Sequence, residues 1–146
     1  MGVNAPTKVL TNSYAGSARL AAVGNNTATN TRIYYDLPVV TGDTIFVSLY
    51  ERSDGQTPTS ILFVIKTIFG GSETSIPIAV TPAWAPDVNG WMKVTATYTV
   101  PSSVDSLRIQ PGINTATNFI GTFGVDAVIA VKSSSPVNFA DGNSPN

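Results

Sequence analysis

Hydrophobic and polar residues alternate with a period of two along most of the chain. In the segment TIFVSLYER, Ile45, Val47 and Leu49 fall on one side, while Tyr50 and Arg52 fall on the other. The segment WMKVTATYTV alternates apolar residues with lysine and threonine in the same way. This spacing is typical of strands that bury one face, and no stretch has the 3.6-residue period of a three-turn amphipathic helix. The pattern predicts an all-β protein.

Glycine, proline and asparagine pairs separate the predicted strands at short intervals. Gly70-Gly71 is expected to close a hairpin, Asp54-Gly55 to form a turn, and Pro111-Gly112 to end or bend the segment SLRIQ. The segment GTFGVDAVIAVK is apolar on both faces, which predicts a central strand. We expect eight or nine strands in a two-sheet antiparallel β-sandwich of jelly-roll type over residues 1–132. Residues 133–146 have no packing pattern and are expected to be a linker or stub.

Composition narrows the possible partners. Charged residues make up 12% of the chain, against a usual share of roughly 25%, and the net charge is −1 without a Lys/Arg cluster. Binding to nucleic acid or to an anionic membrane surface is therefore not expected. The longest strongly apolar runs, residues 61–65 and 127–131, are too short to cross a bilayer, so no membrane insertion is expected.

The chain contains no cysteine and no histidine. Disulfides, thiolate or imidazole metal sites, and Ser-His or Cys-His nucleophile pairs are therefore excluded. Glu51 and Asp54 flank Arg52 and could suggest a glycosidase pair. Glu51 and Arg52 point to opposite faces of one strand, however, and Asp54 belongs to the predicted turn. No motif supplies a base, a nucleophile and an orienting group together, so we expect no enzyme activity and no cofactor.

The order of four segments resembles the jelly-roll type of carbohydrate-binding module over residues 13–131. These segments are SYAGSARLAA, LPVVTGDTIFVSLYERS, Gly90-Trp91 leading into MKVTATYTVP, and FGVDAVIAV with Asp126. Many such modules hold a structural calcium between an early glutamate and the late-strand aspartate. Here no acidic residue precedes Asp36, and Asp126 alone offers too few oxygen ligands. Backbone carbonyls could complete a site, but a metal is not expected.

The last residues, FADGNSPN, resemble the Asp-Gly-Asp/Asn-Ser/Thr-Pro stretch that follows such jelly rolls in minor tail proteins of actinobacterial phages. The resemblance implies an extracellular-facing module of a virion tail that binds host cell-envelope polysaccharide, contacts other tail subunits or domains, and could form a homo-oligomer. Two alternatives stay open. One is a purely structural virion module for decoration or subunit contact. The other is an accessory binding domain of a polysaccharide-degrading enzyme.

The candidate ligand-binding residues are polar or aromatic. Tyr50 and Arg52 lie two residues apart, and Arg108 and Gln110 repeat that spacing, so each pair points to one side of its strand. If the two strands share one sheet, the four side chains would line a shallow groove for a neutral glycan. Trp84, in the proline-bounded loop TPAWAPDVNG, could close one end of the groove or fold back to plug the sandwich. A solvated sheet face is the competing interpretation of the polar set.

Overall fold

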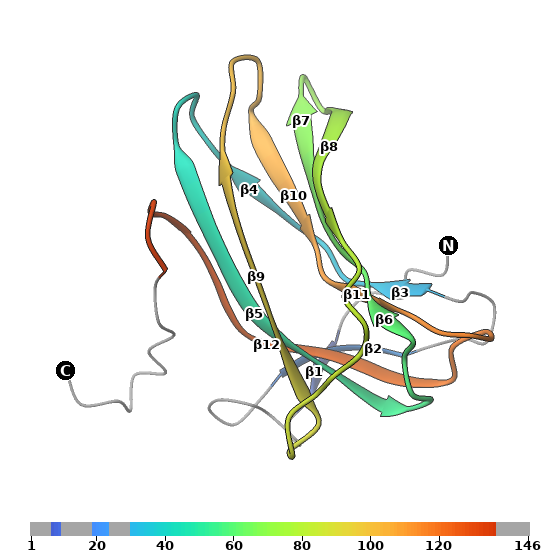
Figure 1. Cartoon of the computed structure of the whole chain (residues 1–146). Coiled ribbons are helices and arrows are strands. Elements are labelled where there is room, and N and C mark those ends of the chain that lie inside the picture. The colour runs from blue at the N-terminus through green and yellow to red at the C-terminus, as the bar shows by residue number, and fades with distance from the viewer. Residues whose placement is uncertain (1–6, 10–18, 24–29, 137–146) are drawn as a thin grey trace.

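The computed structural model describes residues 7–9, 19–23 and 30–136 (Figure 1). These residues form β-strands and no helix, so none of the described segments is a helix that could cross a membrane. The strands are β1 (Thr7–Val9), β2 (Arg19–Val23), β3 (Asn30–Arg32), β4 (Tyr35–Pro38), β5 (Thr44–Gly55), β6 (Ser60–Ile61), β7 (Phe63–Phe69), β8 (Ser72–Val80), β9 (Trp91–Thr99), β10 (Ser106–Gln110), β11 (Gly112–Asn114) and β12 (Gly121–Lys132).

The first sheet has the strand order β1-β2-β12-β5-β9, with antiparallel pairing throughout. β12 lies between β2 and β5, which confirms the central position predicted from its two apolar faces. Its pairing with β2 runs only from Thr122 to Val125. Beyond an irregularity between Asp126 and Ile129, β12 pairs with β5 as far as Lys132. The second half of this strand is therefore an edge of the first sheet among the described strands.

The second sheet is built from two ladders, β4-β10-β7-β8 and β3-β11-β6. Their registers are continuous, because Ile109 pairs with Tyr35 and Gly112 with Arg32 in the same frame. The pairing of β10 with β7 likewise continues into that of β11 with β6. Three strand lines, β3–β4, β6–β7 and β10–β11, thus run the length of the sheet, and β8 adds a fourth. The predicted two-sheet antiparallel sandwich is confirmed, and the described strands lie on nine lines.

The break between β10 and β11 falls at Pro111, which has no N–H to donate to a neighbouring strand. The next amide, that of Gly112, donates to Glu51 Oε1 at 3.2 Å. Gly112 also has no room for a side chain, since a Cβ there would lie 2.7 Å from the Thr31 carbonyl oxygen. The expected bend at Pro111-Gly112 is therefore a local interruption, and the strand line continues past it in register.

The core lies between the two sheets. The alternation of apolar and polar residues along the strands correctly predicts which side chains belong to it. Ile45, Val47 and Leu49 of β5 are buried, as predicted, and Val94 and Val100 lie on the buried side of the β9 segment. In Figure 1, β5 and β9 lie in one layer and β7, β8 and β10 in the other. Fully burying one such apolar side chain contributes about 1.5–3 kcal/mol. The largest fully buried apolar side chains are Phe63, Phe119, Phe123, Leu49, Ile61, Ile65, Leu107 and Ile113.

The prediction of a turn at Asp54-Gly55 is wrong, because these two residues are the end of β5. They pair with Thr122 and Gly121 of β12. Gly55 and Gly121 both have positive φ, 133° and 140°. A Cβ on Gly121 would lie 2.4 Å from the Asp54 carbonyl oxygen. The glycine therefore permits a close approach of two strands, and the chain turns only after residue 55.

Candidate functional site

The structure separates the two pairs of predicted site residues. Tyr50 and Arg52 lie on β5 in the first sheet, whereas Arg108 and Gln110 lie on β10 in the second. Both pairs alternate with core residues and so face away from the core, on opposite outer surfaces of the sandwich. The single groove that was expected to combine them is therefore not formed. Alternation identifies side chains that point away from the core, but it does not show to which sheet a strand belongs.

Trp84 lies in the segment between β8 and β9, and its amide donates to the Thr59 carbonyl oxygen at 3.3 Å. Its side chain is half-buried and packs against the hydrophobic core. This placement agrees with the interpretation of Trp84 as a plug for the sandwich. The structure does not bring it together with Arg108 and Gln110 on the outer surface of the second sheet.

On the first sheet, the guanidinium of Arg52 is already engaged by the protein. It donates from Nε to Asp54 Oδ1 at 2.6 Å and from Nη1 to the Asn89 carbonyl oxygen at 2.5 Å. It also lies 5.9 Å from the centre of the Trp91 ring. Trp91 is buried on this outer surface beside Arg52, its pairing partner on β5. Tyr50 sits two residues away, with the Lys93 ammonium 5.9 Å from its ring.

On the second sheet, polar and aromatic side chains gather on the surface that faces away from the core. We call this surface the polar face. The register places Asp36 opposite Arg108, and Arg108 opposite Lys66, so three charged residues form one row across three strands. The residues of the polar face are Arg32, Tyr34, Asp36, Lys66, Glu73, Arg108 and Gln110.

Arg108 holds the polar face together. Its Nε and Nη2 donate to the two carboxylate oxygens of Asp36 at 2.7 and 2.8 Å. Its Nη1 donates to Glu73 Oε1 at 2.9 Å, and Lys66 donates to the other oxygen of Glu73 at 2.7 Å. The guanidinium also lies 4.6 Å from the centre of the Tyr34 ring. Two cations and two carboxylates therefore balance one another beside a half-exposed aromatic ring.

These contacts shift the titration of the charged groups in the direction that keeps them ionised. The hydrogen bond from Arg108 lowers the pKa of Asp36, and the hydrogen bond from Lys66 lowers that of Glu73. The hydrogen bond to Asp36 raises the pKa of Arg108 above its usual value. Because the side chains are partly exposed, each ion pair contributes only on the order of 1 kcal/mol or less. Their main effect is to hold the Arg108 guanidinium in one orientation.

Two polar atoms of this face are buried without a hydrogen-bond partner among the described residues. One is the acceptor Gln110 Oε1, on a side chain that is 7% exposed, and the other is the donor Arg32 Nε. A Cβ placed on Gly112 would lie 2.8 Å from the Arg32 Cγ, so the Arg32 side chain passes over Gly112. Gln110 precedes Gly112 by two residues on the same strand line. Buried polar atoms normally have partners, so this pair calls for an explanation.

The sequence interpretation identified Arg108 and Gln110 but missed the other residues of the polar face. The signal for Arg32, Tyr34 and Asp36 was present in RIYYDLP, where they alternate with residues of the core phase. Lys66 and Glu73 gave no such signal, because their meeting depends on the hairpin register between β7 and β8. The role of the five predicted residues in ligand binding stays a prediction.

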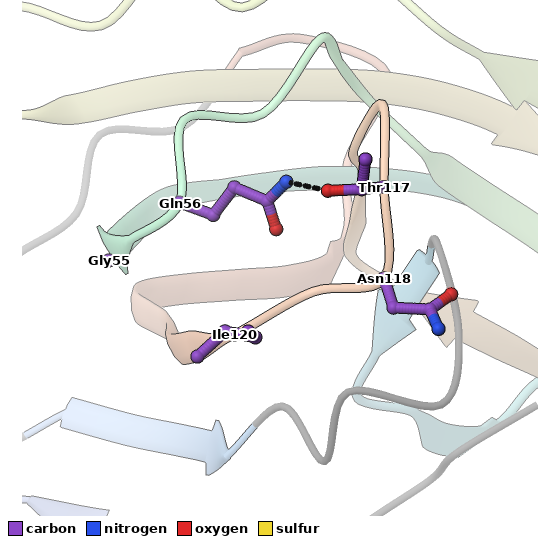
Figure 2. Close-up of a pocket in the computed structure, with 5 residues that line it drawn as sticks. All are labelled: Gly55, Gln56, Thr117, Asn118 and Ile120. Carbon is purple, nitrogen blue, oxygen red and sulfur yellow. Dashed lines mark hydrogen bonds between the residues drawn. The ribbon is translucent and has the colours of Figure 1, made fainter.

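A hollow lies at the end of the sandwich where β5 ends and β12 begins (Figure 2). Gln56 reaches across it and donates from Nε2 to Thr117 Oγ1 at 2.5 Å. The hollow measures about 560 Å³ and is lined by Gly55, Gln56, Thr117, Asn118 and Ile120. These residues include no aromatic ring and no charged group. The hollow therefore lacks the ring on which a sugar could stack.

The calcium site of the resembled modules would involve the late-strand aspartate, here Asp126, together with other acidic residues. The described residues contain no cluster of three or more acidic side chains. Asp126 accepts a hydrogen bond from the Ala127 amide at 2.7 Å and lies opposite Tyr50 on the first sheet.

No protein-family profile matches the chain, and no curated protein sequence matches it. Several solved structures, in contrast, match the chain in fold. The enzymatically active domain of tailspike protein 4 from bacteriophage CBA120 superposes with a TM-score of 0.61 at 12% identity, covering 89% of this chain and 18% of that one. The xylan-binding CBM22-1 domain of Paenibacillus barcinonensis Xyn10C superposes with a TM-score of 0.58 at 18% identity, covering 88% of this chain and 82% of that one. A family 16 carbohydrate-binding module superposes with a TM-score of 0.58 at 14% identity, covering 86% of this chain and 84% of that one. At these identities, the likeness establishes a shared β-sandwich fold with carbohydrate-binding modules.

Proposed function

We propose that this chain is a non-catalytic carbohydrate-binding module and that its ligand lies on the polar face. The observation that carries the proposal is the combination found there. A half-exposed ring, Tyr34, stands beside a fixed guanidinium, and a buried acceptor and a buried donor lack partners among the described residues. Sugars present an apolar C–H face for a ring and hydroxyls that both donate and accept hydrogen bonds.

Each group has a specific task in this proposal. The Tyr34 ring, 50% exposed, packs against a sugar ring. The Asp36 and Glu73 carboxylates accept hydrogen bonds from sugar hydroxyls while Arg108 holds them in place. Gln110 Oε1 accepts from a hydroxyl that reaches the sheet surface. Because these polar groups are already oriented by one another, little conformational entropy is lost when the ligand binds.

The biological setting belongs to the same proposal. The similar structures include a phage tailspike domain and xylan-binding domains of xylanases. The C-terminal segment FADGNSPN favours the virion setting, although residues 137–146 lie outside the described part of the chain. We therefore place the module on a virion tail, facing outward, with host cell-envelope polysaccharide as its ligand. Single-site affinity is expected to be weak, with a Kd on the order of 10⁻⁴ M, so that several copies act together.

Binding to soluble cell-envelope polysaccharides, measured by calorimetry and by affinity gel electrophoresis, tests the proposal. Tyr34→Ala and Gln110→Ala should each weaken binding about tenfold or more without changing the melting temperature by more than a few degrees. Tyr35→Ala is the matched control, because Tyr35 is the neighbouring exposed tyrosine on the core phase of the strand.

Variants of the first sheet show whether the ligand binds there instead of on the polar face. If Tyr50→Ala or Arg52→Ala abolishes binding while Tyr34→Ala retains it, the ligand lies on the first sheet. If no polysaccharide binds at all, the proposal fails, and a structural role in the virion would account better for the fold.

A further inference from the structure

Arg32 differs from the other cations of the polar face, because its charge is not neutralised. Arg108 and Lys66 are paired with Asp36 and Glu73. Among the described residues, the Arg32 guanidinium has neither an ion pair nor a hydrogen bond, and its Nε is buried. Leaving a buried donor without an acceptor costs about 1–3 kcal/mol, and more for a charged group. A ligand that supplies the missing acceptor would remove this cost.

The position of Arg32 relative to Gln110 follows from the register. Arg32 pairs with Gly112, and its side chain passes over this glycine. Gln110 is the preceding side chain on the same face of that strand line, and it is more than nine-tenths buried with Oε1 unpartnered. The absence of a side chain at Gly112 leaves room for the Arg32 stem against the sheet. A cationic donor and a neutral acceptor therefore occupy neighbouring register positions on the same face of the sheet.

We propose that the polar face recognises a glycan whose sugars carry an anionic group, and that Arg32 is the residue that selects it. This inference rests on the proposed function and revises the expectation of a neutral ligand. A guanidinium matches the oxygens of a carboxylate or a phosphate with two parallel hydrogen bonds. The neighbouring Gln110 Oε1 accepts from a hydroxyl of the same or the adjoining sugar. With the other four charges balanced, Arg32 gives the polar face one net positive charge.

Polymers that differ only in charge provide the test. Binding of the intact chain is measured for polygalacturonate against its methyl ester, and for phosphomannan against mannan. We expect at least one anionic polymer to bind about tenfold more tightly than its neutral counterpart, as one charge-assisted hydrogen bond would give. This preference should shrink as salt is raised, because an exposed ionic contact is screened. Comparing the two pairs distinguishes a carboxylate from a phosphate.

Arg32→Met keeps much of the aliphatic stem over Gly112 and removes the charge. It should abolish the preference, so that the charged and the neutral polymer of each pair bind with equal affinity. Arg32→Lys should retain only part of the preference for the anionic polymer, since an ammonium lacks the planar, paired donors of a guanidinium. Equal binding of charged and neutral polymers by the unaltered chain would overturn this inference and leave the proposed function standing. A preference that persists in Arg32→Met would also overturn it. Failure to bind any polymer would overturn both.

Discussion

At the scale of single residues, Glu51 is the most unusual side chain of the core. It is fully buried, accepts the Gly112 amide hydrogen with Oε1, and has no partner for Oε2 among the described residues. Its neighbours across the strands are Val125 and Met92, neither of which can carry charge. Burial raises the pKa of Glu51 well above its usual value, and the Gly112 amide offsets this only in part. The carboxyl therefore holds its proton more tightly in the folded chain than in the unfolded one.

This difference predicts a pH-dependent stability. Between the ordinary glutamate pKa and the raised one, the folded state keeps a proton that the unfolded state has lost. Glu51 therefore lowers stability by about 1.4 kcal/mol for each pH unit in this window. Glu51→Gln can still accept the Gly112 amide and cannot ionise. Its melting temperature should rise relative to the unaltered chain as pH increases, by on the order of 4 °C per unit.

Thermal unfolding from about pH 4 to pH 9 checks the prediction. Glu73→Gln is the control of opposite sign, because the pKa of Glu73 is lowered by Lys66 and Arg108. The stabilisation from Glu73 is present above the ordinary glutamate pKa and is lost as pH falls. This variant should therefore differ from the unaltered chain mainly at neutral and higher pH, where it is less stable. A melting-temperature difference for Glu51→Gln that does not change with pH would contradict the buried-proton account.

At the scale of elements, the close approach of β5 and β12 depends on Gly121. This residue combines a positive φ with a carbonyl oxygen at the place where a Cβ would stand. Gly121→Ala should lower the free energy of unfolding by more than about 3 kcal/mol, because neither backbone can move without breaking the ladder. Chemical denaturation measures this loss.

Gly70→Ala separates the cost of conformation from the cost of the clash. Gly70 also has a positive φ, 56°, but nothing lies within 4 Å of its Cβ position. This control should lose only about 1–2 kcal/mol. Similar losses for the two variants would mean that the strands at Gly121 separate easily.

The strands were predictable from the sequence because alternation and turn residues are local signals. The turn residues predict the Gly70-Gly71 hairpin, and alternation predicts the threonine-lined face of β9. The partition of strands between sheets was not predictable, since it depends on contacts between distant segments. That partition decides the candidate site, because it separates Tyr50 from Arg108. Asp36 and Glu73 are 37 residues apart in the chain, and only the fold brings both to one guanidinium.

At the scale of the whole molecule, the sandwich formed by the described strands is open along one side. The free half of β12 faces β4 across an apolar cleft of about 370 Å³, which reaches Leu49 and Ile109 in the core. Tyr35 and Val128 at its mouth are 61% and 46% exposed. The homo-oligomer expected from the sequence stays a prediction.

The boundary of the domain gives a further prediction. β12 ends at Lys132, and the Ser133 amide makes a last bond to the Thr44 carbonyl oxygen at 2.8 Å. Ser135 and Pro136 are exposed, and residues 137–146 lie outside the described residues. Deleting Ser135–Asn146 should leave the melting temperature unchanged within about 2 °C, because no described core contact is lost. A loss of several degrees would assign the removed segment a role in packing or assembly.

The proton held by Glu51 also affects the molecule as a colloid. The formal net charge of −1 at pH 7 counts eight cations against nine carboxylates, including Glu51. Where the folded chain keeps that proton while its other carboxyl groups are ionised, eight cations face eight carboxylates, and the formal net charge is zero. The folded protein then has a higher isoelectric point than the same chain in denaturant. We expect the folded chain to be least soluble where its net charge is near zero, because a chain without net charge has little repulsion to prevent association.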